Sequence, residues 1–211
     1  TYPEIYEMQI RAVFEALVEL TKKKVKAHPQ IMIPQISSIA ELNHIKKTYD
    51  IIKKETEKKH NMKLKINFGT MIEVVRAALT AEELASTAEF FSFGTNDLTQ
   101  GTFSFSREDV EGKFLPEYME KELLERNPFQ SIDVTGVGSL IKMGIAAGRG
   151  VRPNMEVGIC GEHGGDPSSI KFCHGEGLTY VSASPHRIPI AIVAAAQAAI
   201  EQPKKVRKSR K

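Results

Sequence analysis

The stretch Phe90–Gln100 reads FFSFGTNDLTQ, and it joins an apolar segment directly to a group of polar residues. Its first five residues are apolar or small, which is typical of a strand that is covered on both faces. Thr95, Asn96 and Asp97 follow without any spacer. We therefore predict a strand over residues 90–94 whose tip carries an amide and a carboxylate, and Asp97 there either caps a helix or holds a ligand.

Apolar segments of this kind alternate with helical patterns along the whole chain. This alternation predicts an α/β fold, in which crossover helices connect the strands of a parallel sheet. Ser37 or Ser38 is expected to cap the second helix, and Thr80 with Glu83 to form a capping box. The predicted strands cover 31–34, 64–74, 90–94, 155–161 and 178–184, and the predicted helices cover 4–27, 37–60, 80–89, 117–126, 136–151, 167–177 and 188–200.

Polar side chains stand at the ends of the predicted strands. In a parallel α/β fold these ends meet at one side of the sheet, where ligands bind. Glu73 and Asp97 would bring two carboxylates together there, a pair that suits Mg²⁺. The open alternatives are that Asp97 caps the following helix and that Glu73 pairs with Arg76. The other strand ends carry Gln35, Cys160, Ser182 and Ser184.

Two cysteines occur in the chain, too few for a disulfide framework. Cys160 lies among glycines at a predicted strand end, where a thiol of tunable pKa can give or take a proton. A buried, inert cysteine is the alternative, and for Cys173 we expect that core position. His163 and His174 would complete a set of four possible zinc ligands, but their spacing matches no usual zinc pattern.

Composition and charge narrow the class of protein. Hydrophobic residues make up 41% of the 211 residues and charged residues 26%, as in an ordinary globular protein. We see neither a run that is long enough to span a bilayer nor a secretory signal, and expect a cytoplasmic location, with an organelle as the open alternative. The net charge of +3 comes from residues 203–211, which hold six basic residues and no acid. We expect one domain over 1–202 and a disordered basic tail over 203–211, whose alternative role is nucleic-acid binding or targeting.

Several segments, taken in order, resemble the pyruvate, phosphate dikinase family of phosphoenolpyruvate-utilising enzymes. The resemblance reaches to about Ile200. The related phosphotransferase enzyme I and phosphoenolpyruvate synthase families share the glutamate, the GTNDLTQ and the G-x-C-G elements, whereas GICGEHGGDPSS is typical of the dikinases. The segments are GTMIEVVRAAL (69–79), EFFSFGTNDLTQ (89–100), NPF (127–129), GVGSLIKMGI (136–145), VGICGEHGGDPSSI (157–170) and YVSASPHRIPIA (180–191).

The resemblance implies a fold and a set of site residues. The chain would be the C-terminal phosphoenolpyruvate/pyruvate-binding domain, a (β/α)8 TIM-type barrel of which only the C-terminal five β/α units are present. Mg²⁺ would be the cofactor, held by Glu73 and Asp97. Cys160 would donate a proton to the substrate's methylene carbon or accept one from it. The implied substrate-binding residues are Glu73, Gly94, Thr95, Asn96 and Asp97.

The resemblance also implies an activity and partners. It is Mg-dependent phosphoryl transfer between phosphoenolpyruvate or pyruvate and a phosphohistidine on another domain. The overall reaction would convert ATP, pyruvate and phosphate to AMP, phosphoenolpyruvate and diphosphate, with ATP bound outside this domain. We expect a homodimer or another homo-oligomer, and no membrane or nucleic-acid partner.

Some positions depart from the family pattern. Val75 stands where the family has proline, Ala183 where it has cysteine, and Ile192 where it has arginine. The arginines that grip the phosphoryl group belong to the barrel's early strands, and Arg76 and Arg187 are not obvious replacements. An open five-stranded sheet would also leave its edges exposed. The alternative function is therefore a truncated, non-catalytic fragment that serves as an oligomerisation or binding module.

Overall fold

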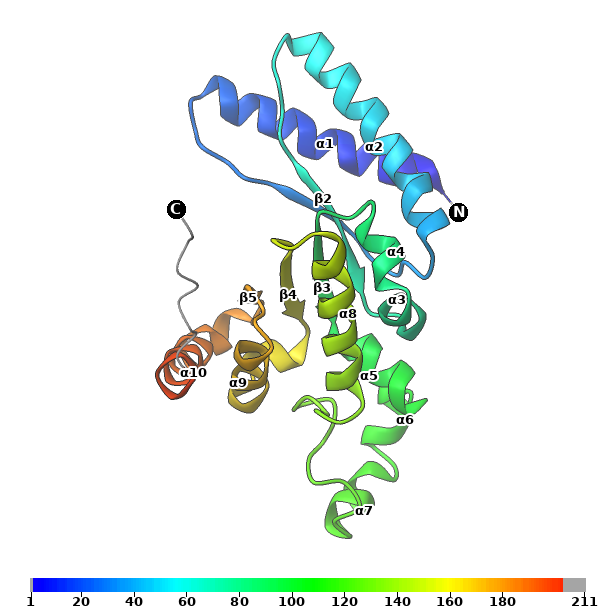
Figure 1. Ribbon diagram of the computed structural model, residues 1–211, viewed down its shortest axis with the longest axis vertical. Helices are drawn as coiled ribbons and strands as arrows, with labels where there is room; N and C mark the ends of the chain where they lie inside the picture. Colours follow the sequence, from blue (N-terminus) through cyan, green and yellow to red (C-terminus); the bar gives the residue numbers. More distant parts are fainter. Residues whose placement is uncertain (1, 203–211) are drawn as a thin grey trace.

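The computed structural model describes residues 2–202, and its centre is a sheet of five parallel strands (Figure 1). The strands lie in chain order across the sheet, so each crossover joins two neighbours. Crossovers of one hand between such neighbours place the helices on one face and curl the sheet, as in a (β/α)8 barrel. The predicted fold class is confirmed as an open arc of five β/α units. The strands are β1 (Gln30–Ile33), β2 (Asn67–Ile72), β3 (Phe90–Gly94), β4 (Glu156–Cys160) and β5 (Tyr180–Val181).

Helices precede the first strand and follow every strand. Figure 1 shows α1 and α2 extending from one end of the molecule and α7 from the other, with the sheet between them. None of the helices within residues 2–202 is long and apolar enough to cross a membrane. The helices are α1 (Pro3–Lys22), α2 (Ile39–His60), α3 (Val75–Leu79), α4 (Ala81–Ala85), α5 (Thr95–Phe103), α6 (Arg107–Glu111), α7 (Leu115–Glu120), α8 (Val137–Val151), the short 3₁₀ helix η1 (Glu162–Gly165), α9 (Pro167–Gly175), the 3₁₀ helix η2 (Pro185–Arg187) and α10 (Ile188–Glu201).

The third strand is the most deeply buried element of the sheet. All five of its residues are buried. Phe91 and Phe93 pack against α8, where Gly148 and Gly144 allow the helix to approach their rings closely, since a Cβ at either glycine would lie 2.8 Å from a ring carbon. Burial on both faces explains why this strand is an apolar run rather than an alternating pattern.

An aromatic chain attaches the first two helices to the sheet. The ring of Tyr49 on α2 lies 5.3 Å from that of Phe14 on α1 and 5.1 Å from that of Phe68 on β2, measured between centroids. Its buried hydroxyl donates a hydrogen bond to the carbonyl of Ile66 at 2.6 Å. Aromatic pairs at such spacings stabilise beyond the area that they bury.

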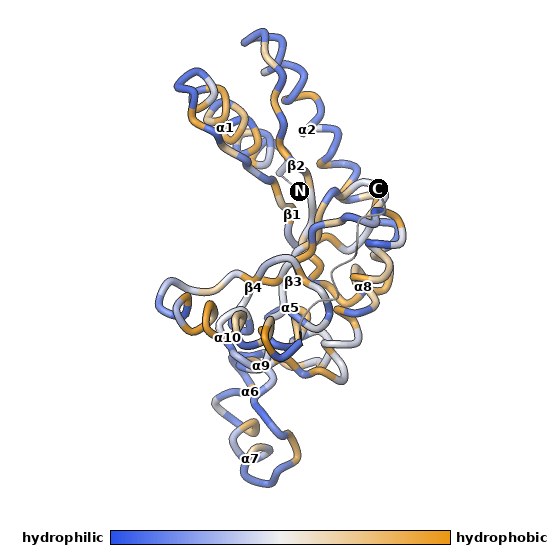
Figure 2. Tube along the Cα trace, turned by 60° about the vertical axis from the view of Figure 1, so that its left-hand side comes forward, coloured by the Kyte–Doolittle hydropathy of each residue, from blue (hydrophilic) through white to orange (hydrophobic). Residues whose placement is uncertain are grey.

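The sheet is open at both sides. Within the described residues β1 pairs only with β2, and β5 pairs only with β4. Helix α10 is a largely hydrophobic helix, in contrast with α2 (Figure 2). It buries a row of alanines but leaves much of its other surface uncovered. Its exposed apolar residues are Ile188, Ile190, Ile192, Val193 and Ile200.

Some element boundaries differ from those predicted. The first helix ends at Lys22 rather than near residue 27. The helix predicted over 117–126 is α7, over Leu115–Glu120, and α6 was not predicted at all. These helices are only one or two turns long, so their sequences carry little periodicity from which to recognise them. The predicted tail over 203–211 lies outside the described residues.

Helix capping was predicted correctly at one place and wrongly at another. Ser38 caps α2, and Glu41 completes a capping box by accepting the Ser38 N–H at 2.9 Å. The box predicted for Thr80 and Glu83 is wrong, because the Thr80 hydroxyl donates instead to the carbonyl of Arg76 at 2.9 Å. Helix α3 ends immediately before Thr80, and its last turn offers that carbonyl.

The two caps can be compared by mutation. Ser38→Ala removes a working cap and should lower the free energy of unfolding by about 1 kcal/mol. Thr80→Ala removes a hydroxyl that does not cap α4 and should cost less than half as much. Urea denaturation of this chain and both variants measures the difference, and an equal or larger loss for Thr80→Ala would contradict the structure.

Candidate functional site

The ends of neighbouring parallel strands gather several polar groups at one edge of the sheet. Gly94 at the end of β3 is paired in register with Cys160 at the end of β4. Ile72 on β2 is paired with Phe93 on β3, so Glu73 follows one position later beside Gly94. Asp97 lies in the first turn of α5, the helix that begins directly after β3.

Glu73 is a buried carboxylate, with 6% of its surface exposed. Its Oε1 accepts the backbone N–H of Gln35 at 2.6 Å. Burial raises the pKa of Glu73, the N–H of Gln35 partly opposes the rise, and the charge of Asp97 raises it further. The pairing with Arg76 that we considered is wrong, because the guanidinium of Arg76 donates to the carbonyl of Ser37.

Asp97 is held by two side-chain amides. Its Oδ2 accepts from Nε2 of Gln35 at 3.0 Å, and its Oδ1 accepts from Nε2 of Gln100 at 3.0 Å. Asp97 forms no capping hydrogen bond, because Gly94 occupies the N-cap position of α5, but it lies in the first turn, where its charge favours the helix as the alternative interpretation expected. Its carboxylate therefore faces Glu73 and the end of β1.

The two carboxylates have no cationic partner among residues 2–202. The same part of the chain holds no cluster of three or more His, Cys, Asp or Glu residues for a metal, and so none formed by the four residues considered for zinc. Two converging carboxylates fit Mg²⁺, which commonly takes one or two such ligands and completes its octahedron with water and substrate oxygens.

Cys160 is half-buried beside this pair. Its Sγ lies 3.7 Å from the carbonyl oxygen of Phe93 and 3.9 Å from Sδ of Met71. Burial raises the pKa of the thiol, a hydrogen bond with Ser92 partly opposes this, and the charges of Glu73 and Asp97 raise it again. The group is therefore a protonated thiol at neutral pH.

The other cysteine belongs to the core. Cys173 is 1% exposed, and burial raises the pKa of its thiol to about 12. It lies on α9, away from the strand ends, as expected from the sequence.

Thr95 and Asn96 connect the start of α5 to the loop after β4. The hydroxyl of Thr95 donates to the carbonyl of Cys160 at 2.9 Å and lies 2.7 Å from Nδ1 of His163. Oδ1 of Asn96 accepts the N–H of Glu162 at 3.2 Å. Thr95 is fully buried, and its side chain is committed to these two contacts.

His163 stabilises this connection from inside. Its Nε2 lies 2.8 Å from the carbonyl of Pro128, and the ring is fully buried. Burial lowers the pKa of His163, so the imidazole is neutral at physiological pH, and both of its ring nitrogens are already engaged, by Thr95 and by the carbonyl of Pro128. It joins the loop after β4 to both α5 and the segment that leads to α8.

Sequence reasoning missed several residues of the site. Gln35 was noted only as a strand-end residue, and Gln100, Met71 and Ser92 received no role. Ser92 also hydrogen-bonds Tyr180, whose pKa is raised mainly by burial, so β3 and β5 both contribute side chains near the thiol. Gln35, Met71 and Ser92 lie on or just after predicted strands and Gln100 on α5, but their contacts depend on which way each side chain points.

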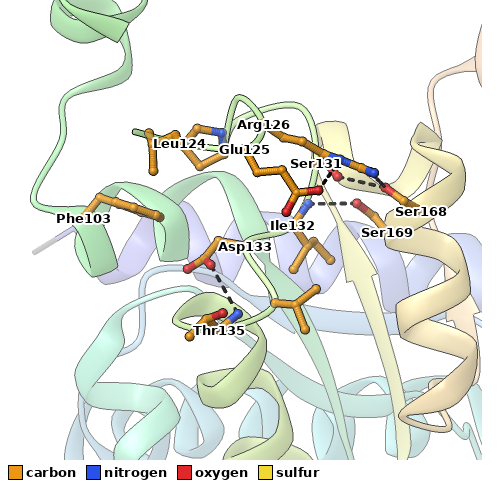
Figure 3. Close-up of a pocket in the computed structure, with 12 residues that line it drawn as sticks. Phe103, Leu124, Glu125, Arg126, Ser131, Ile132, Asp133, Thr135, Ser168 and Ser169 are labelled. Carbon is orange, nitrogen blue, oxygen red and sulfur yellow. Dashed lines mark hydrogen bonds and ion pairs between the residues drawn. The ribbon is translucent and has the colours of Figure 1, made fainter. Parts of the chain in front are cut away.

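A separate cavity lies away from these strand ends (Figure 3). It has a volume of about 330 Å³ and lies beside the loop that precedes α8 and the first turn of α9. In Figure 3 Arg126 reaches Ser168, which also contacts Ser131. The carboxylates do not line this cavity.

The similarity of this chain to known proteins shows its family. Residues 1–200 match the family model described as PEP-utilising enzyme, PEP-binding domain. The chain is 54% identical to pyruvate, phosphate dikinase of Entamoeba histolytica, with 97% of this chain and 23% of that protein covered. For the enzyme of Clostridium symbiosum the identity is 52%, with 95% and 23% covered, and for the chloroplastic enzyme 1 of Arabidopsis thaliana it is 53%, with 95% and 21% covered.

This chain thus spans less than a quarter of the length of these relatives. Among solved structures, a citrate lyase from Burkholderia xenovorans superimposes with a TM-score of 0.52 at 16% identity, covering 81% of this chain and 49% of that one. At that identity the similarity concerns the fold alone.

The contact between Gly94 and Glu73 yields a mutational test. A Cβ at Gly94 would lie 2.5 Å from Oε2 of Glu73 and 2.7 Å from Sδ of Met71. Gly94→Ala should therefore displace the carboxylate and lower the free energy of unfolding by about 1–3 kcal/mol. Gly112→Ala is the matched control, because a Cβ there meets nothing within 4 Å. Equal unfolding midpoints in urea for the two variants would refute the close contact.

The raised pKa of Glu73 gives a pH-dependent expectation. Because the folded-state pKa lies above the unfolded one, protonated Glu73 favours folding at low pH, and this stabilisation is lost as pH rises through the folded-state pKa. Glu73→Gln should therefore raise the thermal midpoint at neutral pH in metal-free buffer, by an amount that shrinks in mildly acidic buffer. If the thermal midpoint of Glu73→Gln at neutral pH equals or lies below that of the unmodified chain, burial and Asp97 do not destabilise the charged form of Glu73.

Proposed function

This chain belongs to the PEP-utilising enzyme family as its PEP-binding domain, and we propose that it is the C-terminal phosphoenolpyruvate/pyruvate-binding part of a pyruvate, phosphate dikinase. The identity of 52–54% to dikinases along nearly the whole chain supports this proposal. The full reaction would convert ATP, pyruvate and phosphate to AMP, phosphoenolpyruvate and diphosphate. A phosphohistidine on another domain of the full-length protein would carry the phosphoryl group.

The observation that carries the proposal is the convergence of Glu73 and Asp97 without a cation partner in the described residues. These two residues would hold Mg²⁺. Bound there, the ion would supply positive charge to the enolate oxygen that develops when the phosphoryl group leaves. The positions of the two carboxylates would determine how far the ion lies from the thiol of Cys160.

The substrate's carboxylate would bind at the start of α5. The first backbone N–H groups of a helix have no partner within the helix, and they attract anions. Gly94, Thr95 and Asn96 present such groups beside Glu73. The amide nitrogen of Asn96 adds a side-chain donor, because the contact with Glu162 uses only its oxygen.

Cys160 would move the proton at carbon. In the direction of pyruvate, the S–H bond breaks as a C–H bond forms at the methylene carbon, and the sulfur keeps the electron pair as a thiolate. The raised pKa of the thiol keeps that proton in place at neutral pH. In the reverse direction the thiolate removes a methyl proton from pyruvate, and this step becomes faster as pH rises toward the pKa of the thiol.

A second candidate function is a non-catalytic oligomerisation or binding module. The unpaired sheet edges and the exposed apolar surface of α10 favour it. Arg76 and Arg187 also bind within the fold, to the carbonyls of Ser37 and Glu162, rather than near the carboxylates. Homo-oligomer formation and a cytoplasmic or organellar location stay predictions.

Ligand binding distinguishes the two functions. Oxalate mimics the enolate of pyruvate, so a working site should bind oxalate only when Mg²⁺ or Mn²⁺ is present. Isothermal titration of the 211-residue chain measures this, with Glu73→Gln as the variant that should lose binding. An absence of metal-dependent oxalate binding in the unmodified chain would favour the non-catalytic module.

Proton exchange tests the thiol. In deuterated water with Mg²⁺ we expect slow loss of the methyl protons of pyruvate, at a rate that increases with pH. Cys160→Ala should reduce this rate by about 100-fold or more while oxalate binding persists. Cys173→Ala, which removes the other thiol in the chain, should retain the exchange. NMR follows the methyl signal, and an undiminished rate in Cys160→Ala would remove the proton-transfer role.

A further inference from the structure

We propose that Gln35 is a positioning residue that holds both metal-binding carboxylates, Glu73 through its backbone and Asp97 through its side chain. The inference rests on the proposed function, because it concerns the same pair of acids. It adds a residue from a third strand end, β1, whose part in the site no sequence motif indicated.

The contacts of Gln35 span the pair from one side. Its backbone N–H donates to Oε1 of Glu73 at 2.6 Å, and its side-chain Nε2 donates to Oδ2 of Asp97 at 3.0 Å. One residue thus supplies two neutral donors to two like-charged groups. Each carboxylate oxygen has two lone pairs, so an oxygen that accepts one hydrogen bond can still bind a cation.

The backbone of Gln35 adopts an unusual conformation where it makes these contacts. Its φ is +55°, in the left-handed region that costs a residue with a Cβ about 1 kcal/mol or more. This conformation turns the chain sharply after β1, with the N–H toward Glu73 and the side chain toward Asp97. A residue kept in a costly conformation must be held there by its surroundings.

The loop around Gln35 provides that support. Ile36 is buried at 3% exposure. The N–H groups of Ser37 and Ser38 both donate to the carboxylate of Glu41, at 2.8 and 2.9 Å, and Arg76 binds the carbonyl of Ser37. The turn is thus anchored by α2 on one side and α3 on the other, and the donors of Gln35 are held in place before any ligand arrives.

Asp97 is oriented from its other side as well. The side-chain Nε2 of Gln100 donates to Oδ1 of Asp97. The side-chain Oε1 of Gln100 accepts the backbone N–H of Arg107 at 3.0 Å, and this second bond fixes the direction of the Gln100 amide. Both donors to Asp97 are neutral amides. They weaken the repulsion between the acids without adding a positive charge that would compete with a divalent ion.

Manganese binding to the 211-residue chain tests the assignment, with free Mn²⁺ followed by electron paramagnetic resonance. Gln35→Ala keeps the Cβ and the backbone N–H and removes only the amide, so it should weaken Mn²⁺ binding by about tenfold, as the loss of an outer-shell partner does. Gln30→Ala is the matched control. Gln30 lies at the other end of β1 and makes the same kind of bond, to Glu156 at 2.9 Å, and its loss should leave the affinity unchanged.

A charge substitution sharpens the test. Gln35→Lys places a cation beside Asp97, so it should raise the thermal midpoint in the presence of a chelator and reduce Mn²⁺ binding more than Gln35→Ala does. If Gln35→Ala loses stability but binds Mn²⁺ as tightly as the unmodified chain, Gln35 only supports the fold and the proposal is overturned. If the unmodified chain binds no Mn²⁺, it is the proposed metal pair that fails.

Discussion

Parallel pairing of β2, β3 and β4 is the constraint on which the site depends. It aligns three strand ends at one edge, so that Glu73, the start of α5 and Cys160 become neighbours although they lie far apart in the chain. β3 is buried on both faces, and α8 packs closely on its Phe91 and Phe93. This packing holds the end of β3 in place relative to α8. A shift of one residue in any of the three strands would turn these side chains to the opposite face.

The same edge concentrates like charge, and the protein does not neutralise it with its own cations in the described region. Glu73 and Asp97 are instead held by neutral donors from Gln35 and Gln100. This arrangement lowers stability, as the raised pKa of Glu73 indicates, and it leaves the positive charge to be supplied by a ligand. Sites that store an unfavourable interaction in this way often exchange stability for function.

The open arc leaves the chemical site outside the cavity shown in Figure 3. A closed barrel surrounds its strand ends with eight loops, whereas five β/α units leave them without walls on one side. The cavity in Figure 3 lies instead between the loop before α8 and the start of α9, where the chain folds back on itself. On α10, Ala191 and Ala194 pack against Ile170 of α9, whereas the isoleucines of α10 stay exposed.

Sequence alone determined the alternation of strands and helices, the five parallel strands and the candidate acids and thiol, because the order of elements dictates which strand ends meet. It did not reveal that Thr80 bonds backward to Arg76, that Thr95 turns inward to His163, or that Gln35 adopts a left-handed conformation between two acids. Each of these depends on the direction of a side chain or a single backbone angle. The bond of Thr80 depends on where α3 ends, and contacts between residues distant in the chain set the directions of Thr95 and Gln35, so only the tertiary structure decided them.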